Sequence, residues 1–135
     1  MNSTYQKETT CHVCIKEGII NDYETITKEY IKIGCVELNL HSGLYFYIGS
    51  KLDISKYKKL GKRELLLLDF LLKNPGCVID KELIVTTVWS NRIVTDSSLN
   101  VTVHNLRQFI KSVSSNILIK NFSGVGYVLY KNTKS

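Results

Sequence analysis

The sequence predicts an α+β domain in which an N-terminal antiparallel sheet precedes three helices and a C-terminal β-hairpin. Three observations support this fold class. Short segments that alternate between apolar and polar residues occupy positions 30–54. Helical patterns follow over positions 56–113, and two apolar strands around a glycine-containing turn occupy positions 117–130. Elements in this order make a winged helix-turn-helix, with the hairpin as the wing.

Length and composition narrow the class of protein. The chain has 135 residues, of which 44% are hydrophobic and 22% are charged, as expected of one globular domain with a real core. No apolar run approaches the ~20 residues that cross a membrane, and the N-terminus has no basic-then-apolar signal segment. We therefore expect the chain to be cytoplasmic.

The beginning of the chain predicts an arm followed by a sheet. Residues 1–29 are polar and weakly periodic, so we expect an N-terminal arm that can add one strand. The domain proper is expected over residues 30–131, with its N-terminal sheet at residues 30–54. Residues 132–135 are expected to form a polar tail.

The first two helices are predicted from their faces and caps. Strong helix formers over residues 56–73 present a wide leucine-rich face, and Gly61 can cap this helix. The next helix begins at Asp80, whose carboxylate can accept backbone N–H bonds from the first turn. Ile79 and Ile84 have the spacing of a hydrophobic staple at its start.

The third helix, residues 97–113, has the clearest periodicity. Asp96, Ser97 or Ser98 is expected to cap it. Its core stripe, at 3.6-residue spacing, consists of Leu99, Val103, Leu106, Ile110 and Val113. The side chains off this stripe are Asn100, Val101, Thr102, His104, Asn105, Arg107, Gln108 and Lys111.

Those side chains suit the reading of DNA. Asn and Gln can pair bidentately with adenine, Arg and Lys reach guanine or phosphate, and Val and Thr can contact thymine methyl groups. Residues 51–135 hold fourteen Lys and Arg against six Asp and Glu, a net charge of +8, whereas residues 1–50 have a net charge of −2. This asymmetry indicates a polyanion partner. A solvated helix face on a charged, soluble surface is the alternative.

The predicted hairpin offers further contacts. Asn121, Ser123 and Tyr127 are expected on it, where a wing would touch the DNA backbone. An ordinary turn with a packed tyrosine is the alternative. Gly124 and Gly126 supply the flexibility that the turn needs.

The four cysteines lack the spacing of a secreted disulfide scaffold. Cys11 and Cys14 are spaced as a metal-binding pair or a redox-sensitive pair, or they have no special chemistry. A structural zinc site needs four ligands and no second paired motif supplies them, so we expect no metal and no cofactor. Cys35 and Cys77 stand among apolar residues, which predicts small core residues. No nucleophile has an activating neighbour and the histidines are scattered, so we expect no enzyme.

The combined pattern resembles the winged-helix effector domain of the OmpR/PhoB class, over about residues 30–131. The matching motifs are Leu60-x-x-x-Glu64-x-x-Leu67-Leu68, Lys81-Glu-Leu83 with Val88-Trp89, Leu99-Asn-Val-x-Val103-x-x-Leu106-Arg107, and Gly124-x-Gly126-Tyr127. The resemblance implies a bacterial, sequence-specific transcription regulator, expected to be an activator, that binds double-stranded promoter DNA. Its third helix would enter the major groove, and its wing would contact the adjacent minor groove or the backbone.

The resemblance also implies roles for individual residues. Contacts with bases or backbone fall at Val101, Thr102, His104, Asn105 and Arg107 on the helix, at Asn121, Ser123 and Tyr127 on the wing, and at Ser97 and Ser98 at the helix start. The loop that would face RNA polymerase or a neighbouring copy consists of Asn91, Arg92, Ile93, Val94 and Thr95.

The sequence departs from the family pattern in charge and in domain order. Family members often carry Arg at the positions of His104, Asn105 and Ser123, so we expect weaker binding by one domain and a preference for A·T-rich DNA. A homodimer or tandem copies would offset that weakness. A winged-helix protein-interaction module with little or no DNA binding is the alternative. A domain near the N-terminus resembles the ToxR/CadC-like regulators, so we expect an inner-membrane anchor only if a span follows residue 135 in a longer protein.

Overall fold

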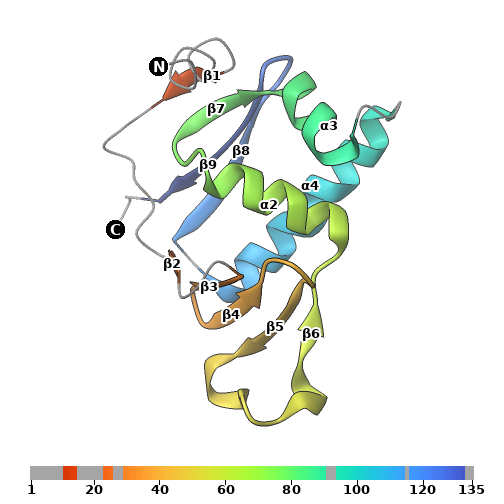
Figure 1. Cartoon of the computed structure of the whole chain (residues 1–135). Helices are drawn as coiled ribbons and strands as arrows, with labels where there is room; N and C mark the ends of the chain where they lie inside the picture. The colour runs from red at the N-terminus through yellow and green to blue at the C-terminus, as the bar shows by residue number, and fades with distance from the viewer. Residues whose placement is uncertain (1–10, 15–22, 26–28, 91–93, 115, 133–135) are drawn as a thin grey trace.

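The computed structural model describes residues 11–14, 23–25, 29–90, 94–114 and 116–132. Within these residues, three α-helices pack with two antiparallel sheets that lie toward opposite ends of the molecule (Figure 1). The predicted winged helix-turn-helix architecture is confirmed. None of the helices in the described part of the chain is long and apolar enough to cross a membrane.

The N-terminal sheet has the strand order β2-β3-β4-β5-β6. Its strands are β2 (Tyr23–Thr25), β3 (Tyr30–Ile33), β4 (Val36–Asn39), β5 (Leu44–Tyr47) and β6 (Lys58–Lys59). Alternate residues of β3 and β4 point toward the helices, so Ile31, Ile33, Val36 and Leu38 are all buried. Two 3-10 turns, Ile48–Ser50 and Ile54–Lys56, connect β5 to β6.

The second sheet, which we call the wing sheet, has the order β1-β7-β9-β8. Its strands are β1 (Cys11–Cys14), β7 (Cys77–Asp80), β8 (Ile117–Phe122) and β9 (Gly126–Lys131). The segment expected to be an arm therefore contributes β1 to this sheet and β2 to the other. β8 and β9 are the predicted hairpin, and Gly124 in its turn has a φ of 77°. Gly126 is needed because a Cβ there would lie 1.9 Å from the carbonyl oxygen of Ile79 in β7.

The first helix begins later than predicted. α2 spans Lys62–Leu72 rather than residues 56–73. Gly61 is its N-cap, as expected. The residues before Gly61 do not continue the helix because β6 pairs there with β5, and this tertiary pairing outweighs local helix propensity.

The start of the second helix is confirmed. In α3 (Lys81–Trp89), Asp80 Oδ2 accepts two N–H groups of the first turn, at 2.9 and 3.3 Å. Ile79 and Ile84, the two staple residues, are both buried. A carboxylate cap and a buried staple thus overcome a stretch of β-branched residues that disfavours helix.

The N-cap of α4 (Asp96–Val113) is Thr95, one residue before the predicted candidates. Its hydroxyl oxygen accepts the N–H of Ser98 at 3.2 Å. Asp96 instead forms an ion pair with Lys81 Nζ at 3.0 Å. That ion pair ties the start of α4 to the start of α3.

One hydrophobic core extends through both sheets and all three helices. The predicted core stripe of α4 is buried in full. Trp89 is buried at the end of α3, and the guanidinium carbon of Arg63 lies 5.4 Å from its ring centroid. Of the two cysteines predicted to be core residues, Cys77 is buried, but Cys35 is exposed. The prediction for Cys35 is wrong because this residue lies in the short turn between β3 and β4, at the rim of the core.

Candidate nucleic-acid interface

α4 presents one continuous exposed stripe on the side opposite its core stripe. We call this the outer stripe; it consists of Ser97, Val101, His104, Gln108 and Lys111. These residues follow one another at spacings of four and three, which places them in one line along a helix. All five are exposed, and Val101 is 57% exposed although it is apolar.

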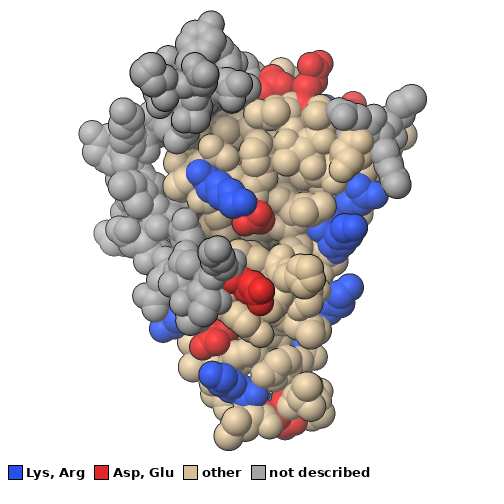
Figure 2. All heavy atoms as spheres, in the orientation of Figure 1, with Lys and Arg blue, Asp and Glu red and all other residues tan. Residues whose placement is uncertain are grey.

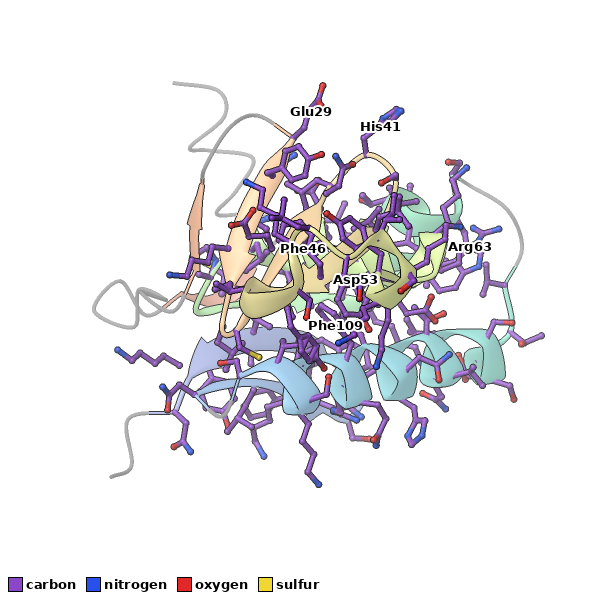
Figure 3. The ribbon with its side chains drawn as sticks, turned by 90° about the horizontal axis from the view of Figure 1, so that it is seen from below. Glu29, His41, Phe46, Asp53, Arg63 and Phe109 are labelled. Carbon is purple, nitrogen blue, oxygen red and sulfur yellow. The ribbon has the colours of Figure 1, made fainter. Side chains whose placement is uncertain are left out.

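The orientation of α4 directs this stripe outward. In Figure 3, Phe109 extends from α4 toward the N-terminal sheet, while side chains on the opposite side of the helix project away from the molecule. The Phe109 ring meets Tyr45 of β5 edge-on, with ring centroids 4.9 Å apart. Because the inner side of α4 is packed in the core, the outer stripe faces solvent along the length of the helix.

Polar residues flank the outer stripe on both sides. Arg107 Nε donates to the carbonyl oxygen of Ile119 in β8 at 3.2 Å, and Asn100, two turns earlier, lies on the same side of the helix. On the other side, Asn105 Nδ2 donates to Glu64 Oε2 of α2 at 3.0 Å. Glu64 therefore holds the amide of Asn105 and brings a negative charge to this flank.

Two residues that were expected to contact DNA lie in the core, and for Tyr127 this is the packed tyrosine that was the alternative. Thr102 is 4% exposed, and its hydroxyl donates to the Ser98 carbonyl at 3.0 Å. It belongs to the inner face because it lies three residues after Leu99 and four before Leu106. Tyr127 is also 4% exposed, because β9 is a central strand between β7 and β8. Neither side chain is part of the candidate interface.

The loop before α4 is described only in part. Asn91, Arg92 and Ile93, which belong to the predicted polymerase or partner loop, lie outside the described residues. Val94 is half-buried against the core, and Thr95 caps α4. Ser97 and Ser98 are exposed in the first turn, where helix N–H groups favour a negatively charged phosphate.

The wing adds a second exposed face. Asn121 and Ser123 are exposed, as a contact role requires. Leu118, Lys120 and Phe122 are also exposed, and Lys120 Nζ lies 5.3 Å from the Phe122 ring centroid. Lys120 and Phe122 were not predicted as site residues, although the alternation of β8 places them on one face with Leu118.

A groove lies between α4 and β8. Arg107, Gln108 and Lys111 line it from the helix, and Leu118 and Ile119 line it from the strand. The rest of the lining is apolar or neutral, so its two cations, Arg107 and Lys111, are the groups that can hold an anion such as a phosphate.

Positive charge also gathers at the start of α2. Lys62 is exposed in its first turn, and Arg63 is half-buried beside Trp89. The hydrogen bond from Asn105 to Glu64 brings this turn next to α4. Figure 2 shows Lys and Arg side chains along the right-hand edge of the molecule, where α2 begins and α4 passes in Figure 1. From the sequence, this charge is visible only as an excess of Lys and Arg over residues 51–135.

The paired cysteines of the sequence begin and end one strand. Cys11 is the first residue of β1 and Cys14 is the last. β1 pairs antiparallel with β7, in a register that sets Cys14 opposite Cys77. Among the described residues, no group of three or more His, Cys, Asp or Glu side chains is placed to hold a metal ion.

Two characterised proteins are similar to part of this chain. Protein PsaE of Yersinia pseudotuberculosis is 32% identical over 74 residues, which cover 55% of this chain and 35% of that protein. Response regulator protein GraR of Staphylococcus saprophyticus is 28% identical over 72 residues, which cover 53% of this chain and 32% of that protein. The alignments thus span about a third of the length of these relatives.

The chain is also similar to a solved DNA-binding domain and matches one protein family. The DNA-binding domain of E. coli CadC has the same fold, with a TM-score of 0.60 at 22% identity, over 74% of this chain and 90% of that one. Residues 56–129, more than half of the chain, match the family described as "Transcriptional regulatory protein, C terminal". The matched segment contains all three helices and most of the hairpin. The chain therefore belongs to this family of transcription regulators, of the OmpR/PhoB type that its motifs resemble.

Proposed function

We propose that this chain is a sequence-specific regulator of transcription that binds double-stranded promoter DNA through α4 and the wing. The observation that carries the proposal is the outer stripe, which runs along a helix of 18 residues, about 27 Å long. A major groove about 12 Å wide admits such a helix. The wing, beside α4, would contact the backbone or the adjacent minor groove.

The outer stripe would supply the base contacts. Gln108 can pair bidentately with N6 and N7 of adenine, and the exposed methyl groups of Val101 can meet a thymine methyl group. His104 can donate or accept a hydrogen bond, depending on its tautomer. Asn105 would contact a base only after its hydrogen bond to Glu64 has broken. This set of side chains favours A·T-rich half-sites.

The cations beside the stripe would bind phosphates. Arg107 and Lys111 border the groove next to β8, and Lys120 extends from the wing. Three to four phosphate contacts correspond to a slope of about −3 to −4 when log affinity is plotted against log salt concentration. Because this number is small, we propose that a homodimer or tandem copies occupy adjacent half-sites.

We further propose that the protein is an activator that contacts RNA polymerase through the loop before α4. The cap by Thr95 and the ion pair between Asp96 and Lys81 support this, because they fix the end of the loop to both neighbouring helices. A promoter-reporter assay with Arg92→Ala tests it. We expect lower activation at unchanged promoter affinity, and unchanged activation would contradict the loop's role.

Selection of bound duplexes from a random pool tests the reading of DNA directly. Gln108→Ala should relax the preference at one base position, at a cost of about 1–3 kcal/mol on the selected site. Lys111→Ala should weaken binding to all duplexes alike and reduce the salt slope by about one. Lys73→Ala is the matched charge control, because Lys73 pairs with Asp69 at the opposite end of α2 from Glu64. A pool in which no motif is enriched would count against the proposal.

The exposed apolar residues of the wing favour one second candidate function. Leu118 and Phe122 are about two-fifths exposed, at 39% and 41%, and apolar surface of this kind can hold another protein. A winged-helix interaction module with little or no DNA binding would bind its partner equally well after Lys111→Ala. It would also show no salt-dependent affinity for any duplex.

A further inference from the structure

The structure assigns Cys14 and Cys77 as a reversible disulfide that joins the N-terminal strand β1 to the wing sheet. Cys77 is disulfide-bonded, and Cys35 is free. The chain has four cysteines, so the partner of Cys77 within the chain is Cys11 or Cys14. Both stand on β1, the strand that borders β7 (Figure 1).

The register of the two strands selects Cys14. Cys14 lies directly opposite Cys77, whereas Cys11 lies opposite Ile79. Directly opposed residues of an antiparallel pair have Cα atoms about 4.5–5.5 Å apart, which is within the range of about 4.4–6.8 Å that a disulfide spans. The diagonal from Cys11 to Cys77 is about 7–8 Å. Cys11 and Cys14 themselves lie about 10 Å apart along an extended strand, too far for a bond between them.

The bond fastens a short strand at the edge of the wing sheet. β1 has four residues and lies at the edge of its sheet, with β7 as its neighbour. The covalent loop from Cys14 to Cys77 encloses more than sixty residues, so closing it removes much conformational entropy from the unfolded chain.

Reduction would uncover a structurally central strand. Cys77 is 0% exposed, in the strand that β1 borders. On its other side β7 pairs with β9, at Ile79↔Tyr127 and Asp80↔Gly126, and Asp80 also caps α3. The bond therefore lies three residues from the junction between the wing and α3. The assignment of the bond between Cys14 and Cys77 does not depend on DNA binding. A change in the wing caused by reduction would, however, alter the proposed DNA interface.

The reaction is thiol–disulfide exchange. A dithiol reductant gives two electrons to the bond between Cys14 and Cys77, its own sulfurs close into a disulfide, and its two protons pass to the cysteine sulfurs. In the reverse direction, a low-molecular-weight disulfide accepts two electrons from the two thiols and leaves as two thiols. The redox potential of the compartment therefore decides which form of the protein is present.

Peptide mapping by mass spectrometry tests the assignment. The full chain is equilibrated with oxidised glutathione, alkylated and digested without reduction. We expect one linked peptide pair, containing Cys14 and Cys77, in the natural chain and in the Cys11→Ser control, and its absence in Cys14→Ser. A linked pair that persists in Cys14→Ser or is lost in Cys11→Ser, or no linked pair in the natural chain, would overturn the assignment.

Thermal unfolding tests the structural effect with the same proteins. Dithiothreitol should lower the Tm of the natural chain and of Cys11→Ser by on the order of 10 °C. It should leave the Tm of Cys14→Ser unchanged. The change is made at Cys14 because Cys77 is buried in the core, where a substitution disturbs packing as well. A Tm that responds equally to dithiothreitol in all three proteins would overturn the role of the bond.

Discussion

Gly126 offers a stringent test of how the wing is joined to the rest of the domain. In Gly126→Ala, the new Cβ would lie 1.9 Å from the carbonyl oxygen of Ile79, 2.8 Å from its carbonyl carbon and 3.3 Å from Asp80 Cα. All three are backbone atoms of β7, so no side chain can rotate to relieve the contact. β9 must therefore move away from β7, which weakens the pairings at Ile79↔Tyr127 and Asp80↔Gly126.

The expected loss follows from these contacts. Overpacking that forces a backbone shift costs about 1–3 kcal/mol, and each weakened backbone hydrogen bond adds about 0.5–1.5 kcal/mol. We expect the free energy of unfolding to fall by about 3 kcal/mol in Gly126→Ala. Gly124→Ala is the matched control, since Gly124 has a φ of 77° but nothing within 4 Å of its Cβ position. Backbone strain alone should cost about 1 kcal/mol there.

Urea unfolding followed by circular dichroism measures both losses. Reducing buffer is required, so that the disulfide of Cys77 does not contribute to the difference between variants. The difference in unfolding free energy is then taken at a common slope of free energy against urea. Equal losses in the two variants, or a loss below about 1 kcal/mol in Gly126→Ala, would refute the close approach of β9 to β7.

Three further predictions test the core, a cap and a corrected site residue. Leu106→Ala removes a fully buried side chain from α4 and should lower the unfolding free energy by about 2–5 kcal/mol in urea. Asp80→Ala removes the N-cap of α3 and should cost about 1 kcal/mol, most of which Asp80→Asn should restore, since Asn can accept the same N–H bonds. Thr102→Val should leave the affinity for selected DNA unchanged in an anisotropy titration, because the side chain is buried. A tenfold loss of DNA affinity, about 1.4 kcal/mol, would show instead that Thr102 contributes to the interface.

The elements that local chemistry determines could be predicted from the sequence. The core stripe of α4 has a helical period over fifteen residues, from Leu99 to Val113, and all of it is buried. Asp80 and the staple formed by Ile79 and Ile84 specify the start of α3 within one turn. Most of the outer stripe was predicted from the same periodicity, because residues directly opposite the core stripe of an amphipathic helix face solvent.

Most of the wrong predictions concern residues whose secondary structure or burial depends on pairing with distant parts of the chain. Lys58 and Lys59 have helix propensity, but pairing with β5 makes them a strand. Tyr127 was expected to contact DNA from the wing, with a packed tyrosine as the alternative. The side chain is packed because β9 lies between two other strands, an arrangement that depends on long-range pairing. The error at Thr102 has a local cause. Its spacing from Leu99 and Leu106 indicates the buried face of α4, but its polar side chain suggested an exposed position. The opposition of Cys14 and Cys77 depends on strand register, which spacing along the sequence does not reveal.

The most direct test of the central claim is an anisotropy titration of the purified chain against a selected duplex and a base-shuffled duplex, over a series of salt concentrations. We predict that the selected duplex binds about a thousandfold more tightly, at the low end for specific binders because few cations face the DNA. Both duplexes should show a log–log salt slope of about −3 to −4. Equal affinity for the two duplexes, or an affinity that does not change with salt, would contradict DNA reading by α4.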